Sequence, residues 1–204
     1  MKVFITGATG YVGSHVAQAM SRAGHEVHGL VRSEEKAKML AGQEIRPVKG
    51  SLQQPESYMP VAEQCSVLIH AAADRQGDIA GLEKNVVESL LQAAKRGPQP
   101  KTFLYTSDVW LYGDTRDRLV DETTSVAPPT MVTWRPGIEE MVLRASHVRS
   151  IVLRPGCLYG KQGGLTGQWF TGAYKEKALR VIGDGNNRWA IVHADDVLAA
   201  ERQV

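Results

Sequence analysis

The 204-residue chain is poor in cysteine, in charge of one sign and in long apolar runs, and each shortage excludes a class of protein. Its two cysteines, Cys65 and Cys157, stand far apart without metal-ligand spacing, so we expect reduced thiols in a cytoplasmic protein. The net charge of +2, with no tract of Lys or Arg, argues against nucleic acid as a partner. No run of about 18 apolar residues and no secretory leader is evident, so we expect neither a membrane nor a secreted protein.

Strand-like and helix-like segments alternate along the chain, which is typical of a parallel sheet covered by helices on both faces. We therefore predict an α/β fold, a doubly wound parallel sheet of the Rossmann type, over residues 1–155. From residue 156 the chain is rich in glycine and aromatic residues, which predicts a small, partial substrate lobe, residues 156–204, packed on the same domain. The predicted strands are residues 2–6, 26–32, 44–49, 66–72, 101–107 and 150–154, and the predicted helices are residues 11–23, 34–41, 79–96 and 138–146.

The segment TGATGYVG places Gly7, Gly10 and Gly13 between the first predicted strand and the first predicted helix. The first glycine allows a tight turn, the second lets the backbone approach a pyrophosphate, and the third lets helix and strand pack closely. The free N–H groups and the dipole at the helix N-terminus favour an anion there. In this context, the turn predicts a binding site for a nicotinamide dinucleotide.

The end of the second predicted strand bears on the choice between NAD and NADP. NAD sites usually carry an acidic residue about 20 positions after the glycines, where it binds the ribose hydroxyls. This chain reads HGLVRS there, and Arg32 can pair with a 2′-phosphate, with Lys36 or Lys38 assisting. We expect NADP, and NAD is the alternative if Arg32 is only a solvated surface cation.

Five motifs follow one another along the chain: TGATGYVG, VLIHAAA, TFLYTSDVWLYGD, VLRPGCLYG and VHADDV. By these motifs the chain resembles the extended short-chain dehydrogenase/reductase family, the NAD(P)-dependent nucleotide-sugar epimerases and dehydratases. The resemblance spans essentially the whole chain, and five ordered motifs are more specific than the glycines alone.

The resemblance implies roles for residues spread along the chain. The glycine turn would hold the pyrophosphate, the segment around Ser51 would flank the adenine, and the residues after the sixth predicted strand would lie near the nicotinamide. Ser51 replaces an acid that is usual in the family. Asn85 would support the active-site strand, and Arg188 would hold a substrate phosphate. The predicted cofactor-binding residues are Gly7, Thr9, Gly10, Tyr11, Val12, Gly13, Arg32, Ser51, Leu52, Ala71, Ala72, Ala73, Pro155 and Gly156.

The proton-transfer pair usual in this family, a tyrosine and a lysine four residues apart, is missing. The expected place reads MVTWRPGIEEMVL, and no tyrosine occurs between Tyr112 and Tyr159. The hydroxyl usual at the end of the fifth strand is replaced by Asp108. Ser107, Asp108, Tyr112 and Lys161 are the candidate substitutes, and each could instead be a turn, cap or surface residue.

Two functions remain open from the sequence. The first is an NADP(H)-dependent reductase or epimerase-like enzyme with substitute proton-transfer groups, acting on a nucleotide sugar or another carbonyl compound. The alternative is a catalytically inactive NAD(P)-binding sensor or scaffold. We expect His70 to be a core histidine whose ring nitrogens are hydrogen-bonded. We expect no metal and no membrane partner. A homodimer is possible, because it is usual among similar proteins. Members of the family are typically longer. We therefore expect either that the chain is naturally short, or that its substrate pocket is incomplete or is completed by a partner.

Overall fold

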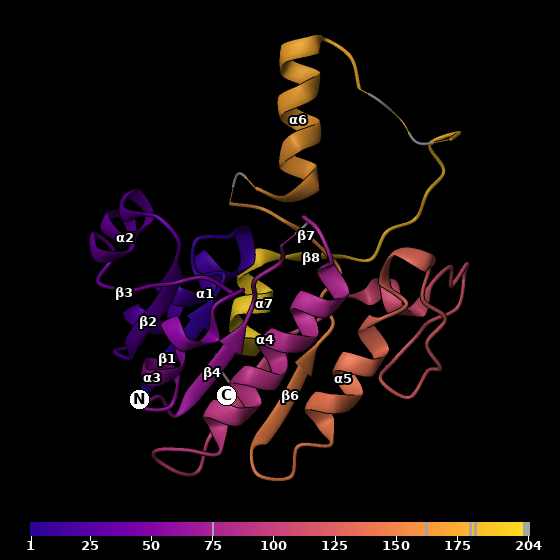
Figure 1. Ribbon diagram of the computed structural model, residues 1–204. Coiled ribbons are helices and arrows are strands. Elements are labelled where there is room, and N and C mark those ends of the chain that lie inside the picture. Colours follow the sequence, from indigo (N-terminus) through magenta and orange to yellow (C-terminus); the bar gives the residue numbers. More distant parts are fainter. Residues whose placement is uncertain (75, 162, 180, 182, 202–204) are drawn as a thin grey trace.

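The computed structural model describes residues 1–74, 76–161, 163–179, 181 and 183–201. Its centre is a six-stranded sheet in the order β3-β2-β1-β4-β5-β6, in which all neighbouring strands are parallel (Figure 1). All six predicted strands are present, and the predicted Rossmann-type α/β fold is confirmed. The strands are β1 (Lys2–Thr6), β2 (Glu26–Val31), β3 (Arg46–Lys49), β4 (Val67–His70), β5 (Thr102–Thr106) and β6 (Arg149–Leu153).

Helices cover both faces of this sheet, and each face has its own core. Side chains alternate along a strand, so Val3 and Ile5 of β1 pack against α1 and α2, while Phe4 packs on the other face with α3, α4 and α5. The α-helices of this part are α1 (Tyr11–Arg22), α2 (Glu34–Ala41), α3 (Met59–Ala62), α4 (Ile79–Ala94) and α5 (Arg135–Leu143), and the 3-10 helices are η1 (Pro55–Ser57), η2 (Val109–Tyr112) and η3 (Thr130–Val132).

Two element ends differ from the prediction in ways that matter for the site. β4 ends at His70 rather than at residue 72, because the chain leaves the sheet there and Ala71 and Ala72 line a groove. α5 begins at Arg135 rather than at residue 138. Its Pro136 stands in the first turn, where a helix makes no use of the N–H that proline lacks.

The C-terminal part consists of β7 (Cys157–Tyr159), α6 (Gly164–Glu176), β8 (Ile191–His193) and α7 (Ala194–Glu201). β7 and β8 form a separate two-stranded parallel sheet. α7 packs against α1, whereas α6 projects from the body and has no buried residue (Figure 1). Phe170 and Tyr174 of α6 are 79% and 78% exposed. The predicted boundary after residue 155 stays a prediction.

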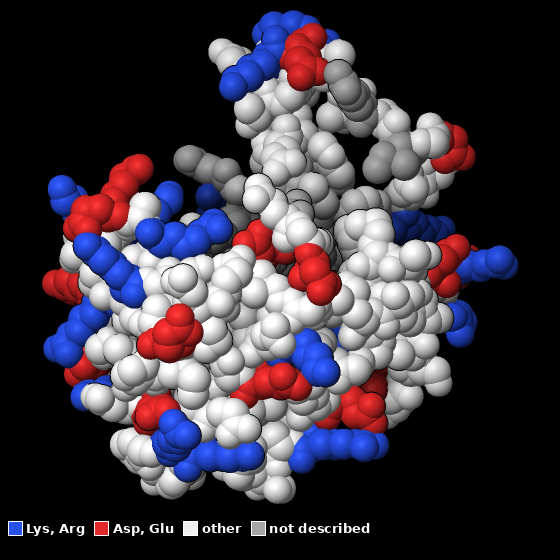
Figure 2. Space-filling model, in the orientation of Figure 1, with Lys and Arg blue, Asp and Glu red and all other residues white. Residues whose placement is uncertain are grey.

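Charges of both signs are interspersed over the face of the molecule shown in Figure 2. This distribution agrees with the small net charge of +2. Among the described residues, no helix combines the length and the apolar character that a membrane span requires.

Candidate functional site

A groove of about 200 Å³ opens at the carboxyl ends of β1, β2 and β4. The chain runs outward from β1 to β3 and then returns to place β4 on the other side of β1, so the strand order reverses between β1 and β4. In open α/β sheets, ligands bind at this reversal point. The groove is lined by Gly7, Thr9, Gly10, Leu30, Val31, Arg32, Leu52, Gln53, Ala71, Ala72, Ala73 and Asp74. It therefore brings together eight of the predicted cofactor residues from four separate segments: Gly7, Thr9, Gly10, Arg32, Leu52, Ala71, Ala72 and Ala73.

The turn after β1 has no room for side chains at two of its glycines. Gly7 has a φ of +75°, and a Cβ there would lie 2.5 Å from the carbonyl oxygen of Ala71. A Cβ on Gly13 would lie 2.3 Å from the carbonyl oxygen of Gly7. The turn thus depends on glycine both for its backbone conformation and for the close packing of α1 on β1 and β4.

The first turn of α1 points toward the groove and carries no competing negative charge. Gly10 is the N-cap, offers no side chain to the first N–H groups, and is followed by no acidic residue in that turn. Those N–H groups and the positive end of the helix dipole are suited to a phosphate.

Apart from Gly13, five predicted cofactor residues are not among the residues that line the groove. Tyr11 donates a hydrogen bond of 2.7 Å to the carbonyl oxygen of Gly160 and so links α1 to the end of β7. Ser51 donates to the side chain of Gln53, which does line the groove. Pro155 follows β6 and accepts a 3.2 Å bond from the N–H of Val109. The other two are Val12, which is partly buried in α1, and Gly156, which packs against Ala190.

Arg32 meets a carboxylate that the sequence HGLVRS does not supply. Its Nη1 lies 3.6 Å from Oδ2 of Asp74, four residues beyond the end of β4. The side chain of Arg32 is 77% exposed and that of Asp74 only 17%. Parallel pairing brings the ends of β2 and β4 to the same edge of the sheet, which explains how residues 42 positions apart meet.

Candidate proton-transfer residues lie at the end of the neighbouring strand, β5. Ser107 is buried, and its hydroxyl has no hydrogen-bond partner among the described residues. Asp108 is the N-cap of η2, and its Oδ1 accepts a 2.9 Å bond from the N–H of Trp110. The other oxygen, Oδ2, lies 3.2 Å from Nε of Arg135. The structure thus places Asp108 in an ion pair.

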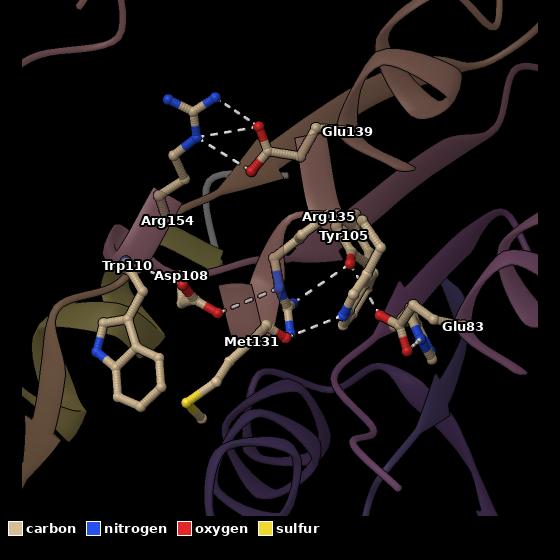
Figure 3. A network of polar contacts seen from close by, with 10 residues as sticks. Glu83, Tyr105, Asp108, Trp110, Met131, Arg135, Glu139 and Arg154 are labelled. Atoms are coloured by element: carbon tan, nitrogen blue, oxygen red, sulfur yellow. Dashed lines mark hydrogen bonds and ion pairs between the residues drawn. The ribbon is translucent and has the colours of Figure 1, made fainter. Parts of the chain in front are cut away.

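Arg135 connects Asp108 to a buried polar network (Figure 3). Its Nη1 lies 3.3 Å from the hydroxyl of Tyr105, and Tyr105 donates a 2.8 Å bond to Glu83 of α4. Burial and the Glu83 carboxylate raise the pKa of the Tyr105 phenol, whose side chain is fully buried. This phenol is therefore not available as the tyrosine that the sequence lacks.

The network continues to β1 through His70. The imidazole forms a 2.5 Å hydrogen bond with Oγ1 of Thr6, and its Nε2 lies 3.3 Å from Oε2 of Glu83. Burial alone would raise the pKa of Glu83, but its contacts with His70, Tyr105 and Arg135 outweigh burial and lower it. His70 is a core histidine, as predicted, but it is satisfied at Nδ1 alone: among the described residues its Nε2 has no hydrogen-bond partner.

The prediction for Asn85 is wrong. This residue lies on the exposed side of α4 and lines a groove that includes Leu82 and Glu88. The α4 side chain that supports β5 is that of Glu83, which turns inward two residues earlier. A half-turn of helix separates the two faces, and the apolar spacing around residues 83, 86, 87 and 90 could have shown this.

Tyr112 belongs to a second ion-pair network. Its hydroxyl donates to the carbonyl oxygen of Asp121 at 2.8 Å and accepts a 2.7 Å bond from Nη1 of Arg154. Arg154 also contacts both carboxylate oxygens of Glu139, at 2.5 to 3.1 Å. Because both sides of the Tyr112 hydroxyl are engaged, the structure gives Tyr112 a positioning role within the loop and not a free phenol.

The last two predicted residues, Lys161 and Arg188, form ion pairs of their own. Lys161 pairs with Asp195 at 2.9 Å, and Arg188 pairs with Asp117. Arg188 nevertheless lines a cavity of about 310 Å³ together with Trp110, Tyr112 and Trp189. Within the described part of the chain, no group of three acidic, histidine or cysteine side chains could hold a metal ion.

Sequence reasoning missed Arg135, Glu139 and Glu83 as members of the site. Arg135 and Glu139 lie one turn apart in α5, a spacing that predicts a pair between them, whereas the structure pairs Arg135 with Asp108 and Glu139 with Arg154. Glu83 offered only the weaker signal of a carboxylate on the apolar face of a helix.

The glycine turn, the groove at the strand reversal and the parallel sheet define a nucleotide-binding α/β protein of the Rossmann type. Residues 3–202 match the NAD dependent epimerase/dehydratase family, and the chain belongs to this family. It is thus a member of a family of NAD(P)-dependent enzymes.

Among curated relatives, the chain is similar to two reductases. A 4-hydroxy-2-methyl-3-oxo-4-farnesyl-3,4-dihydroquinoline-1-oxide ketoreductase of Stigmatella aurantiaca is 28% identical over 99% of this chain and 65% of the relative. A 2'-dehydrokanamycin reductase of Streptomyces kanamyceticus is 28% identical over 98% of this chain and 56% of the relative. The chain thus spans less than two thirds of the length of these relatives.

Solved structures share the fold. A dTDP-glucose 4,6-dehydratase of Bacillus anthracis in complex with NAD has a TM-score of 0.85 and 21% identity, covering 98% of this chain and 70% of that chain. A UDP-glucose 4-epimerase of Thermotoga maritima with UDP-glucose has a TM-score of 0.85 and 18% identity, covering 99% of this chain and 72% of that chain.

Proposed function

We propose that this chain is an NADP(H)-dependent oxidoreductase or epimerase-like enzyme in which Asp108, held by Arg135, replaces the usual tyrosine and lysine. The observation that carries the proposal is that one edge of the sheet holds both the glycine-lined groove and the Asp108–Arg135 pair. When bound, the nicotinamide dinucleotide supplies or accepts a hydride.

The residues of the groove fit such a cofactor. The turn at Gly7 and Gly13 excludes side chains, and the N-terminus of α1 offers N–H groups to a pyrophosphate. The small side chains of Ala71, Ala72 and Ala73 leave room along the trough. Arg32 at the end of β2 would pair with a 2′-phosphate and so favours NADP over NAD.

Asp108 is the group that would move the proton. Its carboxylate would accept the proton of a substrate hydroxyl during oxidation and return it to the carbonyl oxygen during reduction. Arg135 fixes the carboxylate at 3.2 Å, and the N–H of Trp110 fixes its other oxygen at 2.9 Å. The neighbouring Ser107 hydroxyl, which has no hydrogen-bond partner in the part of the chain that the structure describes, would bind the substrate oxygen.

The substrate is proposed as a carbonyl compound or the corresponding alcohol. Both reductases described above are named for substrates that are not nucleotide sugars, whereas the structural neighbours act on nucleotide sugars. Arg188, in the cavity with Trp110 and Trp189, would hold an anionic group of the substrate.

An alternative is a cofactor-binding sensor without turnover. The engagement of Asp108 by Arg135 and of Tyr112 by Arg154 favours it, because both groups already have protein partners. Fluorescence-monitored NADPH oxidation against a panel of ketones, aldehydes and nucleotide sugars separates the two. Turnover of any member supports the enzyme, and binding of NADPH without turnover of any member supports the sensor.

The cofactor assignment is tested by titrating NADPH and NADH. We expect the native protein to bind NADPH more tightly and Arg32→Glu to reverse this order, because the new carboxylate repels a 2′-phosphate and can accept ribose hydroxyls. Arg22→Glu, which makes the same change of charge in the last turn of α1, should preserve the native order. Equal native affinities would refute the NADP assignment.

The assignment of Asp108 is tested by Asp108→Asn. We expect turnover to be lost, by about 100-fold or more, while the dissociation constant for NADPH is unchanged, because an amide cannot take up the proton. Asp114→Asn, which changes an exposed acid after the same strand, serves as the control. Unchanged turnover in Asp108→Asn would remove this residue from the mechanism.

A further inference from the structure

Asp74 is the one carboxylate among the described residues that line the groove, and it faces Arg32. Three groups hold it. Arg32 Nη1 lies 3.6 Å from its Oδ2, Gln53 Nε2 donates to Oδ2 at 3.4 Å, and the N–H of Gln76 donates to Oδ1 at 3.2 Å. Its side chain is only 17% exposed, so it is fixed in the groove wall and not free in solvent.

We propose that Asp74 is a second determinant of cofactor choice that opposes Arg32 and preserves binding of the cofactor without a 2′-phosphate. The inference rests on the proposed function, because it concerns the same dinucleotide groove. It adds a residue from the segment after β4 to a choice that the sequence alone assigns to Arg32, directly after β2.

The opposition follows from charge. A 2′-phosphate carries a charge of about −1.5 to −2 at neutral pH. To pair with it, the Arg32 guanidinium must turn from Asp74, and the phosphate must then lie near an ionised carboxylate whose remaining partners are Gln53 and the N–H of Gln76. Like charges within a few ångströms repel most strongly where burial reduces solvent screening. Asp74 therefore weakens binding of the phosphorylated cofactor.

The same carboxylate favours the unphosphorylated cofactor. An acid at this end of the groove can accept hydrogen bonds from ribose hydroxyls, which is the role of the acidic residue in NAD sites. Arg32 need not move in that case, because its ion pair with Asp74 is preserved. The two residues thus act in opposite directions, and the net preference is smaller than Arg32 alone would produce.

The test is the ratio of the NADH to the NADPH dissociation constant, measured by fluorescence titration in native protein and in Asp74→Asn. The amide is isosteric, and its one oxygen can still accept from the N–H of Gln76, so the variant should fold as the native protein does. We expect the ratio to rise about tenfold, with tighter NADPH and weaker NADH, as for loss of one charged contact on each side. Glu140→Gln, which removes a carboxylate from the exposed side of α5, should leave the ratio unchanged.

An unchanged or lower ratio in Asp74→Asn overturns the inference. This outcome is separate from the proposed NADP preference, which is read from the native protein alone. A double variant, Arg32→Gln with Asp74→Asn, provides a second measurement. If the residues act through their contact, the effect of Asp74→Asn on the ratio should differ between the native and the Arg32→Gln background; identical effects in both backgrounds also refute the proposed opposition.

Discussion

Glu139 and Glu140 are consecutive residues of α5 whose carboxylates have opposite surroundings. The Glu139 side chain is 4% exposed and meets Arg154, which is 21% exposed. The Glu140 side chain is 59% exposed and pairs with Arg144, which is 79% exposed. Both pairs join a glutamate to an arginine, so substitution of each glutamate by glutamine isolates the effect of burial.

Removing one partner of a buried ion pair leaves a charge without compensation and costs about 3–5 kcal/mol. Because Arg154 keeps some solvent and the hydroxyl of Tyr112, we expect the lower end, about 3 kcal/mol, for Glu139→Gln. An exposed helical pair contributes about 0.3–0.5 kcal/mol, which sets the expectation for Glu140→Gln.

Urea unfolding measures both values. With a slope of about 2 kcal/mol per molar urea, Glu139→Gln should lower the midpoint by about 1.5 M and Glu140→Gln by about 0.2 M. Arg154→Lys keeps the charge but loses the two-nitrogen contact with Glu139, so its midpoint should fall between these two. Shifts of equal size in the two glutamine variants would refute the assignment of the buried pair as a stabilising contact.

Two further predictions concern the glycine turn and the buried network. Gly7→Ala should abolish NADPH binding and destabilise the fold, because φ is +75° and a Cβ would lie 2.5 Å from the oxygen of Ala71. The control Gly172→Ala, whose Cβ meets no atom within 4 Å, should do neither. A Gly7→Ala protein with native affinity for NADPH would contradict this account of the turn. The lowered pKa of Glu83 means that its contribution to stability is complete above its ordinary value of 4.5 and is lost as the pH falls through its lower folded value. The difference in unfolding free energy between native protein and Glu83→Gln should therefore be constant above about pH 4.5 and shrink below it. A difference that grows on acidification would contradict a lowered pKa of Glu83 in the folded protein.

Local patterns in the sequence determined the elements and the glycine turn. The alternation of strand-like and helix-like segments predicted all six strands of the sheet. The clearest signal was the apolar run at β4, which is buried throughout, as expected of a parallel strand covered on both faces. The spacing of Gly7, Gly10 and Gly13 predicted the turn, since its backbone conformation and close packing exclude other residues. Strand formation and the turn conformation both depend on residues that are close together in the sequence, so the sequence alone was enough to predict them.

The tertiary structure alone decided which charges meet. Asp74 faces Arg32, and Arg135 joins Asp108 to Tyr105, although the members of each contact come from different elements. Parallel strands bring their carboxyl ends to one edge whatever their distance along the chain, and the distances between charges there depend on register and helix rotation. The local sequence named Arg32 and Asp108, but their contacts with Asp74 and Arg135 are set by the order of the strands and the placement of the helices, which no local pattern encodes.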